Sequence, residues 1–407
     1  MSWLSNNKIF SLSDFSLNNQ TVILRVDYNV PLKAGKVLDN TRIKATLPTI
    51  KYLLEQNCKI VLATHIGRPE GKVIPELRTN SLVKELKKML PNKTIIKLNN
   101  CIGPEIKQKI RQGKPKQIFL LENLRFYKEE EQNDLVFAHS LASLGDYYIN
   151  NAFADAHRKH ASIQAITHFL PSAPGLLFEL EISQLSKALN PHKPLIWILG
   201  GAKLDKLELI ESALKKSDYI LIGGALAFSF LKAKGYSVGM SKIDSQAVKK
   251  LKKIINSRKI ILPVDVVTAT QPHHKGQICP INQMPLNQMG LDIGPRTIEL
   301  FKHYLQKANT IVWNGPLGYF ESSQFNKGTN TIALFISKLP TTTIIGGGET
   351  SQAINKLKLN KLITHISTGG GATLEFLTGK KLPAVKALEE NYLKFRKKIK
   401  KSYPKFR

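Results

Sequence analysis

The chain contains a repeated pattern of short apolar runs, each of which ends abruptly in glycines or in polar residues. In the first half the runs end in charged or amide residues, as where residues 21–26 lead into Asp27. In the second half they end in glycines, most clearly at 346–348 and 369–371. Because open parallel sheets bind ligands at the carboxyl ends of their strands, these endings predict binding loops. Glycine loops at such places can offer backbone N–H groups to phosphate.

Helix-like segments separate the apolar runs, and this alternation predicts α/β architecture, with parallel sheets covered by helices on both faces. The predicted strands are 21–26, 59–64, 118–121, 147–150, 195–199, 219–222, 260–263, 310–313, 342–345 and 363–367. The predicted helices are 46–55, 80–90, 177–189, 205–216, 245–256 and 295–306. So many strands exceed one compact sheet of common size, and a chain of 407 residues has room for two or three domains.

A domain boundary is expected near residue 172. The segment 170–175 (LPSAPG) has the composition of a loop, and helical spacing follows it, so we interpret the region as a helical linker between two α/β domains. The expected divisions are an N-terminal domain over 1–172, a linker helix over 173–190, a second domain over 191–380, a return toward the first domain over 381–390 and a basic extension over 391–407.

The basic extension holds eight Lys and Arg residues and no acidic residue. Leu393, Phe395 and Ile399 hint at a weak amphipathic helix that Pro404 ends. Because charged terminal runs are commonly disordered, we predict a solvated tail; contact with RNA or a membrane is the alternative.

The composition narrows the functional classes. No apolar run approaches the roughly 18 residues of a membrane span, and residues 1–17 lack the apolar stretch of a signal peptide, so we expect a cytoplasmic protein. Cys58, Cys101 and Cys279 show no metal or redox spacing, and we expect reduced thiols. The net charge of +30 fits nucleic acid, an anionic surface or an acidic substrate as partner. It also fits A·T-rich coding, because Lys, Ile and Asn are all abundant.

The first half offers residues suited to an acidic small molecule. Asp27 and Asn29 fall on one side of an extended segment, where they can hold hydroxyl groups. Basic side chains follow the strand ends, and guanidinium forks match both carboxylate and phosphate. These basic residues are Arg42, His65, Arg68, Arg125 and Arg158. Ordinary surface ion pairing is the alternative for any one of them taken alone.

The second half offers features suited to a nucleotide. Neither a P-loop nor a GxGxxG motif is present, so a nucleotide site must use other glycine loops. Two triple-glycine runs stand between a strand and helix-like residues, which suggests helix N-termini approached by phosphate. Lys203 follows glycines 200–201 and can neutralise a phosphoryl group. Glu349 can bind Mg²⁺, an ion that prefers oxygen ligands.

Taken together, these residues resemble the phosphoglycerate kinase family. The resemblance extends over about residues 8–390, and its strings stand in the family's order. The matching strings are RVDYNVPL, ATHIGRP, FLLENLRF, NAFADAHRKHAS, GGAK, GGALAF, LPVDVV, DIGPRTIELF, WNGPLGYFE, IIGGGET and HISTGGGATLEFL. Several such strings in one order make the resemblance very specific.

The resemblance implies two Rossmann-like three-layer domains with parallel sheets, facing each other across a cleft and joined by a helical hinge. It implies reversible phosphoryl transfer between 1,3-bisphosphoglycerate and ADP, giving 3-phosphoglycerate and ATP, in glycolysis and gluconeogenesis. The N-terminal domain would bind the phosphoglycerate, whose carboxyl group accepts the phosphoryl group. The C-terminal domain would bind Mg²⁺ with ADP or ATP. A cytoplasmic monomer is implied as well.

The family's motifs carry over residue by residue. Contacts to the phosphoglycerate are implied for Asp27, Asn29, Arg42, His65, Arg68, Arg125, His157 and Arg158. Contacts to the nucleotide are implied for Gly201, Lys203, Gly223, Gly224, Asn314, Pro316, Glu321, Gly347, Gly348, Glu349 and Thr350, with Glu349 as the metal ligand. Stabilisation of the transition state is assigned to Arg42, Lys203, Gly370 and Gly371.

The chain departs from the family's usual pattern at four places. The departures are Glu349 for aspartate, Lys206 three residues after Lys203 instead of four, Asn151, Ala154 and Asp155 for Asp, Gly and Thr, and the basic extension. Asp155 is expected to place a negative charge near Arg158 and to weaken anion binding. The alternative function is therefore a catalytically weakened relative that binds RNA or an anionic surface through its basic charge.

Overall fold

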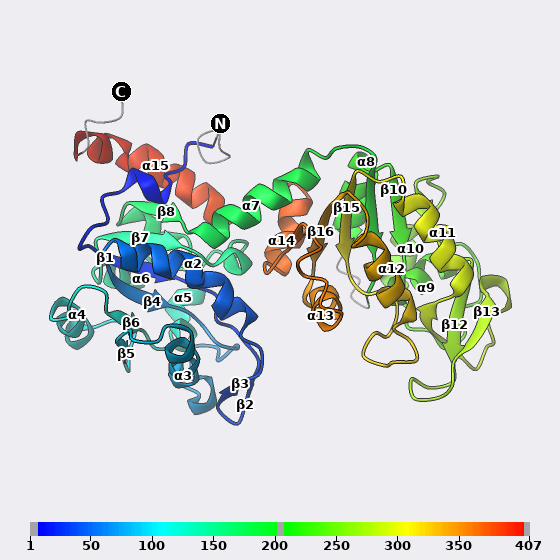
Figure 1. The fold of residues 1–407 in the computed structure, drawn as a ribbon, viewed down its shortest axis with the longest axis horizontal. Coiled ribbons are helices and arrows are strands. Elements are labelled where there is room, and N and C mark those ends of the chain that lie inside the picture. The colour runs from blue at the N-terminus through cyan, green and yellow to red at the C-terminus, as the bar shows by residue number, and fades with distance from the viewer. Residues whose placement is uncertain (1–6, 202–206, 403–407) are drawn as a thin grey trace. The chain divides into compact units, whose positions relative to one another are not determined.

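The structure is a computed structural model that describes residues 7–201 and 207–402, with side-chain surroundings as far as residue 399. The chain forms two compact units (Figure 1). Unit 1 contains Met1–Ser183 together with Lys381–Arg407, and unit 2 contains Gln184–Lys380. The chain passes from unit 1 to unit 2 within helix α7 (Leu176–Leu189).

Unit 1 is built on a six-stranded parallel sheet in the order β5-β6-β4-β1-β7-β8. Its strands are β1 (Thr21–Arg25), β4 (Lys59–Ala63), β5 (Ile95–Lys97), β6 (Ile118–Leu120), β7 (Tyr147–Asn150) and β8 (Ser172–Pro174). A separate antiparallel hairpin joins β2 (Leu32–Lys33) and β3 (Lys36–Val37). The helices of this unit are α2 (Thr41–Glu55), α3 (Asn80–Met89), α4 (Pro104–Arg111), α5 (Lys128–Glu131), α6 (Leu135–Ala142) and α15 (Pro383–Ser402).

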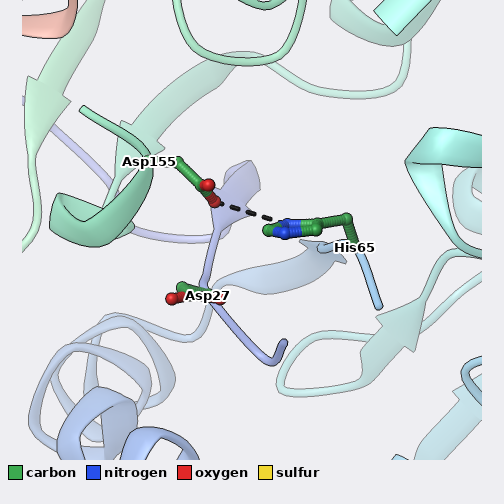
Figure 2. Close-up of side chains that lie close together, drawn as sticks. All are labelled: Asp27, His65 and Asp155. Carbon is green, nitrogen blue, oxygen red and sulfur yellow. Dashed lines mark ion pairs between the residues drawn. The ribbon is translucent and has the colours of Figure 1, made fainter. Parts of the chain in front are cut away.

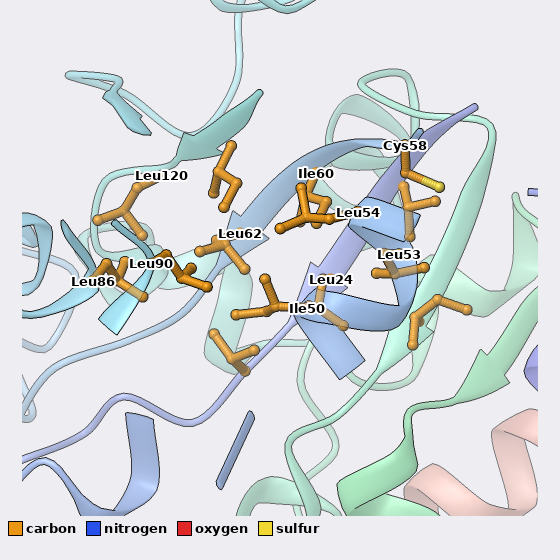
Figure 3. Close-up of a cluster of buried hydrophobic side chains, with 14 of the residues drawn as sticks. Leu24, Ile50, Leu53, Leu54, Cys58, Ile60, Leu62, Leu86, Leu90 and Leu120 are labelled. Carbon is orange, nitrogen blue, oxygen red and sulfur yellow. The ribbon is translucent and has the colours of Figure 1, made fainter. Parts of the chain in front are cut away.

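Two hydrophobic clusters cover opposite faces of this sheet, because successive side chains of a strand point to opposite faces. Val22 and Leu24 join residues of α2 and α3 in one cluster, part of which is shown in Figure 3. Ile23, between them, joins residues of α4 and α6 in the other cluster. Each fully buried leucine contributes about 1.5–3 kcal/mol. The strands are therefore apolar on both faces, which is why the apolar runs of the sequence are continuous.

Unit 2 has a second six-stranded parallel sheet, in the order β11-β10-β9-β15-β16-β17. The strands are β9 (Leu195–Leu199), β10 (Tyr219–Ile222), β11 (Ile260–Ile261), β15 (Thr310–Asn314), β16 (Thr342–Gly346) and β17 (His365–Ile366). The helices are α8 (Leu207–Lys216), α9 (Gly224–Ala233), α10 (Ser245–Leu251), α11 (Pro295–Leu305), α12 (Lys327–Ile336), α13 (Gly348–Lys356) and α14 (Gly371–Leu377). This order is that of a Rossmann fold. The predicted pair of Rossmann-like units with parallel sheets is confirmed.

Unit 2 also contains a small antiparallel sheet that the strand pattern did not predict. Its strands are β12 (Asp265–Ala269), β13 (Gln277–Pro280) and β14 (Met289–Ile293), in the order β13-β12-β14. A bulge interrupts the pairing of β12 with β14 between Val267 and Thr268. Val266 of β12 packs with Phe228 and Leu231 of α9 in a separate hydrophobic cluster.

Two predictions at the ends of unit 1 are wrong. Segment 170–175 was predicted to be a loop, but Ser172–Pro174 forms edge strand β8. The tail that was predicted to be solvated forms helix α15 as far as Ser402, and Ile399 is buried in the same hydrophobic cluster as Val22 and Leu24. Asn391 joins the two elements, because its side-chain oxygen accepts the Ser172 N–H at 2.9 Å. Of the three apolar residues of the extension, Ile399 is buried and Phe395 is partly buried against this cluster, whereas Leu393 is 53% exposed.

The three cysteines are free thiols, and Cys58 and Cys101 are buried. Burial raises the pKa of the Cys58 thiol to about 12, which keeps it protonated and unreactive at neutral pH. Within residues 7–201 and 207–402, no helix has the length and apolar character needed to cross a membrane.

Candidate active site

The candidate site of unit 1 lies where the chain changes direction across its sheet. From β1 the chain continues to β4 on one side, whereas β7 lies on the other side. Asp27, His65 and Asp155 follow the carboxyl ends of these three strands, and their side-chain oxygen and nitrogen atoms lie within 4.8 Å of one another (Figure 2). Ligands of open α/β sheets bind at such a position.

Asp27 organises the loop that follows β1. Its Oδ1 accepts the Asn29 N–H at 3.0 Å, and its Oδ2 pairs with Nη1 of Arg42 at 2.5 Å. Arg42 comes from α2, and the same Nη1 donates to the Asn29 carbonyl at 3.2 Å. The Asn29 side chain accepts the Gly67 N–H at 2.9 Å, which ties the loop after β4 to the loop after β1.

Arg25 is a fully buried arginine at the end of β1 that the sequence analysis did not single out. Its Nη2 pairs with Oδ2 of Asp155 at 3.0 Å, and its Nε donates to Oγ of Ser162 at 2.8 Å. Ser162 in turn donates to the buried carboxylate of Glu130 at 2.6 Å. Arg25 thereby holds Asp155 in place from the interior of the unit.

The charges of these groups follow from their surroundings. Burial lowers the pKa of His65 well below its ordinary value, and the nearby arginines lower it further, although Asp155 opposes them. The neutral ring can accept a hydrogen bond through Nδ1, and Nη2 of Arg25 lies 3.3 Å from that atom. Burial alone would raise the pKa of Asp155, but His65 and Arg25, followed by Arg125 and Arg158, hold it below the ordinary value. Because His65 is neutral at neutral pH, the arginines are the effective partners of Asp155.

The group formed by Asp27, His65 and Asp155 has the residue types of a metal site. However, guanidinium groups already pair with both carboxylates, from Arg42 to Asp27 and from Arg25 to Asp155. We therefore interpret the group as the charge balance of an arginine cluster at these strand ends, formed by Arg25, Arg42, Arg125 and Arg158.

Arg125 has the environment of an anion-binding residue. Its side chain is only 2% exposed, and its Nη1 donates to the Gly67 carbonyl at 2.8 Å. Among the described residues, its Nη2 has no hydrogen-bond acceptor. Buried guanidinium N–H groups normally have acceptors, so this atom points to an anionic ligand.

The other predicted residues of unit 1 lie on the same loops. Nε of Arg158 lies 3.4 Å from Oδ1 of Asp155, as the sequence predicted. Arg68 is exposed on the loop after His65, and His157 is half-buried beside Arg158. The structure connects Asp27, Asn29, Arg42, His65, Arg125 and Arg158 through one set of contacts.

In unit 2, the loops after β9, β10 and β15 are packed backbone against backbone. The Gly201 N–H donates to the Pro316 carbonyl at 2.7 Å, and the Gly224 N–H donates to the Leu317 carbonyl at 2.9 Å. Gly224 has φ +57°, and a Cβ there would lie 2.5 Å from the Gly201 nitrogen and 2.6 Å from the Pro316 oxygen. Gly223, the residue before it, begins α9 as its N-cap. The glycines are needed because the loops approach one another too closely for side chains.

A cavity of about 340 Å³ lies beside these loops. The predicted residues that line it are Gly201, Gly224, Pro316, Glu321 and Glu349. Its apolar lining, which the sequence did not predict, includes Phe228 of α9 and Met289 and Leu291 of β14. A mostly apolar cavity with a few polar groups is typical of a small-molecule site. Met289 and Leu291 were missed because they belong to the sheet that the strand pattern did not predict.

Helix α13 brings Glu349 and Thr350 to the same strand ends. Gly347 is its N-cap with φ +91°, and Glu349 is exposed in the first turn and lines the cavity. The buried Thr350 hydroxyl accepts the Gly315 N–H at 2.7 Å, which fixes the loop after Asn314. A single exposed carboxylate fits Mg²⁺ held together with nucleotide phosphates, since this ion often binds one or two carboxylates plus phosphates.

The second triple glycine begins helix α14. Gly370 is its N-cap with φ +51°, and Gly371 is its first residue. The Gly369 N–H donates to Oγ of Ser367 at 3.1 Å, so this amide already has an acceptor. The first amides of a helix lack an acceptor within the helix, which leaves Gly370 and Gly371 as the candidates for phosphate. Lys203 lies outside the described residues.

The family model described as phosphoglycerate kinase matches residues 12–380. The chain belongs to the phosphoglycerate kinase family. A relative from Moorella thermoacetica named phosphoglycerate kinase is 46% identical over 392 residues, which cover 93% of this chain and 99% of the relative. A relative of the same name from Dictyoglomus turgidum is 44% identical over 397 residues, or 95% of this chain and 100% of the relative.

Solved structures of phosphoglycerate kinases are also similar to this chain. The phosphoglycerate kinase of Coxiella burnetii is similar with a TM-score of 0.82 at 36% identity, covering 94% of this chain and 99% of that one. The phosphoglycerate kinase of Pyrococcus horikoshii gives a TM-score of 0.84 at 34% identity, covering 95% and 100%. The resemblance to phosphoglycerate kinases that the sequence motifs predicted is confirmed, and no finding favours the alternative of a repurposed binding protein.

Proposed function

We propose that this chain catalyses reversible phosphoryl transfer between 1,3-bisphosphoglycerate and ADP, giving 3-phosphoglycerate and ATP. The family match over residues 12–380 carries the proposal. The arginine-rich loops of unit 1 and the glycine-lined cavity of unit 2 supply the two kinds of site that such a reaction needs. We also propose that the protein works as a cytoplasmic monomer in glycolysis and gluconeogenesis.

The acidic substrate binds in unit 1 in this proposal. Arg125 and Arg158 offer guanidinium groups to its phosphate and carboxylate, and the half-exposed Arg42 reaches from α2. Asp27 and Asn29 hold the substrate hydroxyl, and His65, Arg68 and His157 complete the predicted set. Asp27 also sets the direction of the Arg42 side chain through their 2.5 Å pair.

The nucleotide binds in the cavity of unit 2 in this proposal. The apolar wall at Phe228 and Leu291 accepts the base, and Glu321 holds the ribose hydroxyls. The remaining predicted contacts come from Gly201, Lys203, Gly223, Gly224, Asn314, Pro316, Gly347, Gly348 and Thr350. Glu349 would hold Mg²⁺, which when bound neutralises phosphate oxygens.

Phosphoryl transfer itself requires little covalent chemistry from the protein. In the direction of ATP synthesis, an ADP oxygen forms a bond to phosphorus, and the bond from phosphorus to the carboxylate oxygen breaks. The carboxylate is a good leaving group, so no protein nucleophile is required. Catalysis is positioning and stabilisation of charge on the equatorial oxygens. We assign that stabilisation to Arg42, Lys203 and the amides of Gly370 and Gly371.

Because the two substrates are assigned to different units, we also propose that a hinge movement accompanies transfer. Such closure excludes water, which would otherwise hydrolyse the acyl phosphate. Helix α7, which passes from one unit to the other, is the proposed hinge.

A coupled assay with ATP and 3-phosphoglycerate tests the proposal. Wild type should turn over both substrates with saturation, and Arg42→Met should lower kcat by about 10²–10³-fold because one charge-stabilising contact is lost. Arg111→Met is the matched control, since Arg111 is an exposed arginine of α4 outside the site. Absence of turnover by folded wild type would overturn the proposed function. An equal effect of both variants would overturn the role of Arg42.

A further inference from the structure

Asp155 is a buried carboxylate within the arginine cluster of unit 1, and several contacts hold it in position. It ends the short helix η4 (Phe153–Asp155) after β7, and its side chain is 5% exposed. Arg25 holds Oδ2 at 3.0 Å. Arg25 is itself fixed by hydrogen bonds to the Val26 carbonyl at 2.5 Å and to Ser162 at 2.8 Å. These contacts keep the negative charge of Asp155 within the arginine cluster.

The same carboxylate touches two of the residues proposed to bind the substrate anion. Oδ1 lies 3.4 Å from Nε of Arg158, and Oδ2 lies 3.4 Å from Nδ1 of His65. The Arg158 side chain is 32% exposed, so a ligand can approach it from solvent while Asp155 remains covered. Salt screens such a buried charge much less than it screens an exposed one.

We propose that Asp155 is an internal counter-anion that sets the affinity of this arginine cluster for phosphate and carboxylate ligands. It takes up part of the positive potential of Arg158, and it repels a ligand of like charge. The arginine cluster therefore binds anions more weakly, and releases them more readily, than it would without this carboxylate. The identity of the natural ligand, 3-phosphoglycerate or its bisphosphate, rests on the proposed function; the effect on anions in general does not.

The alternative role for Asp155 is a clamp that merely positions Arg158, and the two roles predict opposite signs. If Asp155 only positions the guanidinium, its removal weakens anion binding. If it acts as a counter-anion, its removal strengthens anion binding. Asp155→Asn separates the roles, because the amide keeps an oxygen that can accept from Arg158 while it removes the charge.

The experiment is calorimetric titration of wild type and Asp155→Asn with inorganic phosphate and, separately, with 3-phosphoglycerate. We expect Kd for both ligands to fall about tenfold, because the variant lacks one negative charge close to the bound anion. The fall should shrink only modestly when salt is added. Glu131→Gln is the matched control, since Glu131 pairs with Arg125 at the same 3.4 Å but is 39% exposed. We expect this control to change Kd less than about twofold, because exposed charges are screened.

The fold of the variants must be checked, since Asp155→Asn leaves Arg25 buried without its closest counter-charge. Thermal melting monitors this. Should Asp155→Asn fail to fold, the double variant Arg25→Gln/Asp155→Asn is compared with Arg25→Gln. We then expect the double variant to bind phosphate more tightly than Arg25→Gln does. Unchanged or weaker phosphate binding by a folded variant lacking the Asp155 charge would overturn the inference. Equal tightening by Glu131→Gln would do the same. Wild type that binds phosphate but neither binds nor converts 3-phosphoglycerate would instead overturn the proposed function.

Discussion

Replacing Asn391 should destabilise unit 1 strongly, because this residue of α15 satisfies buried backbone groups far away in the sequence. Its Oδ1 accepts the Ser172 N–H at 2.9 Å, and its Nδ2 donates to the carbonyls of Thr167 at 2.5 Å and Leu170 at 2.8 Å. The Leu170 carbonyl also accepts from the Ser172 hydroxyl at 2.7 Å, so it keeps a donor when Asn391 is lost. Asn391→Ala therefore removes the partner of one N–H and one carbonyl.

Each buried group left without its partner costs about 1–3 kcal/mol. The expected loss is thus about 2–6 kcal/mol, a large share of the roughly 5–15 kcal/mol that stabilises a typical domain. Urea unfolding followed by circular dichroism measures it, and hydrogen exchange should show loss of protection first at residues 165–175.

Lys394→Ala is the control for this prediction. Lys394 lies on the same helix and donates to the His168 carbonyl at 2.9 Å, but this bond is exposed. We expect Lys394→Ala to change the free energy of unfolding by less than about 0.5 kcal/mol. If Asn391→Ala were no more destabilising than Lys394→Ala, the packing of α15 on β8 would not have the energetic role argued from these contacts.

Three further results are expected. Gly224→Ala should weaken ADP binding more than about tenfold by calorimetry, because the new Cβ would lie 2.5 Å from the Gly201 nitrogen; unchanged affinity would contradict the packing argument. Glu349→Ala should raise KM for Mg²⁺-ATP about tenfold through loss of one charge-assisted contact, and Glu349→Asp should alter the ratio of Mg²⁺ to Mn²⁺ activity. Equal ratios in wild type and Glu349→Asp would refute the metal role. Lowering the pH from 6.5 to 4 should reduce the free energy of unfolding by about 3 kcal/mol through His160. Burial lowers the pKa of this histidine to about 4, so within that pH range the unfolded histidine is protonated and the folded one is not. His160→Gln should remove this part of the pH dependence in urea unfolding, and parallel pH profiles would show the assignment to be wrong.

The parallel strands could be predicted from the sequence because they are buried on both faces. The run Thr21–Arg25 is apolar at its three central positions and is buried throughout. Trp313 and its neighbours in β15 give the same continuous signal. Central parallel strands can thus be predicted from their apolar composition alone.

The missed elements carry weaker signals for physical reasons. β8 has three residues and ends in Pro174, which a strand tolerates here because β8 lies at the edge of its sheet. The antiparallel strands β13 and β14 are only partly buried, and Gly290 interrupts β14. Neither the composition nor the period of these segments separates them from loops.

The candidate site was predictable in its residue types and less so in its connections. Strand-end residues such as Asp27 and His65 follow from the rule that ligands bind there. The role of Arg25 could not be predicted, because its partner Asp155 is 130 residues away in the chain and an arginine at a strand end normally faces solvent. The proximity of Asp155 to Arg158 was predictable, since the two are three residues apart.

Phosphoryl transfer is tested most directly by ³¹P NMR of the purified chain with Mg²⁺, ATP and 3-phosphoglycerate, with hydroxylamine added to trap the acyl phosphate. We expect ATP to be converted to ADP only when 3-phosphoglycerate is present, with an equal amount of hydroxamate formed. ATP that stays constant beside folded protein, or that is consumed without 3-phosphoglycerate, would contradict the assignment of this chain as a phosphoglycerate kinase.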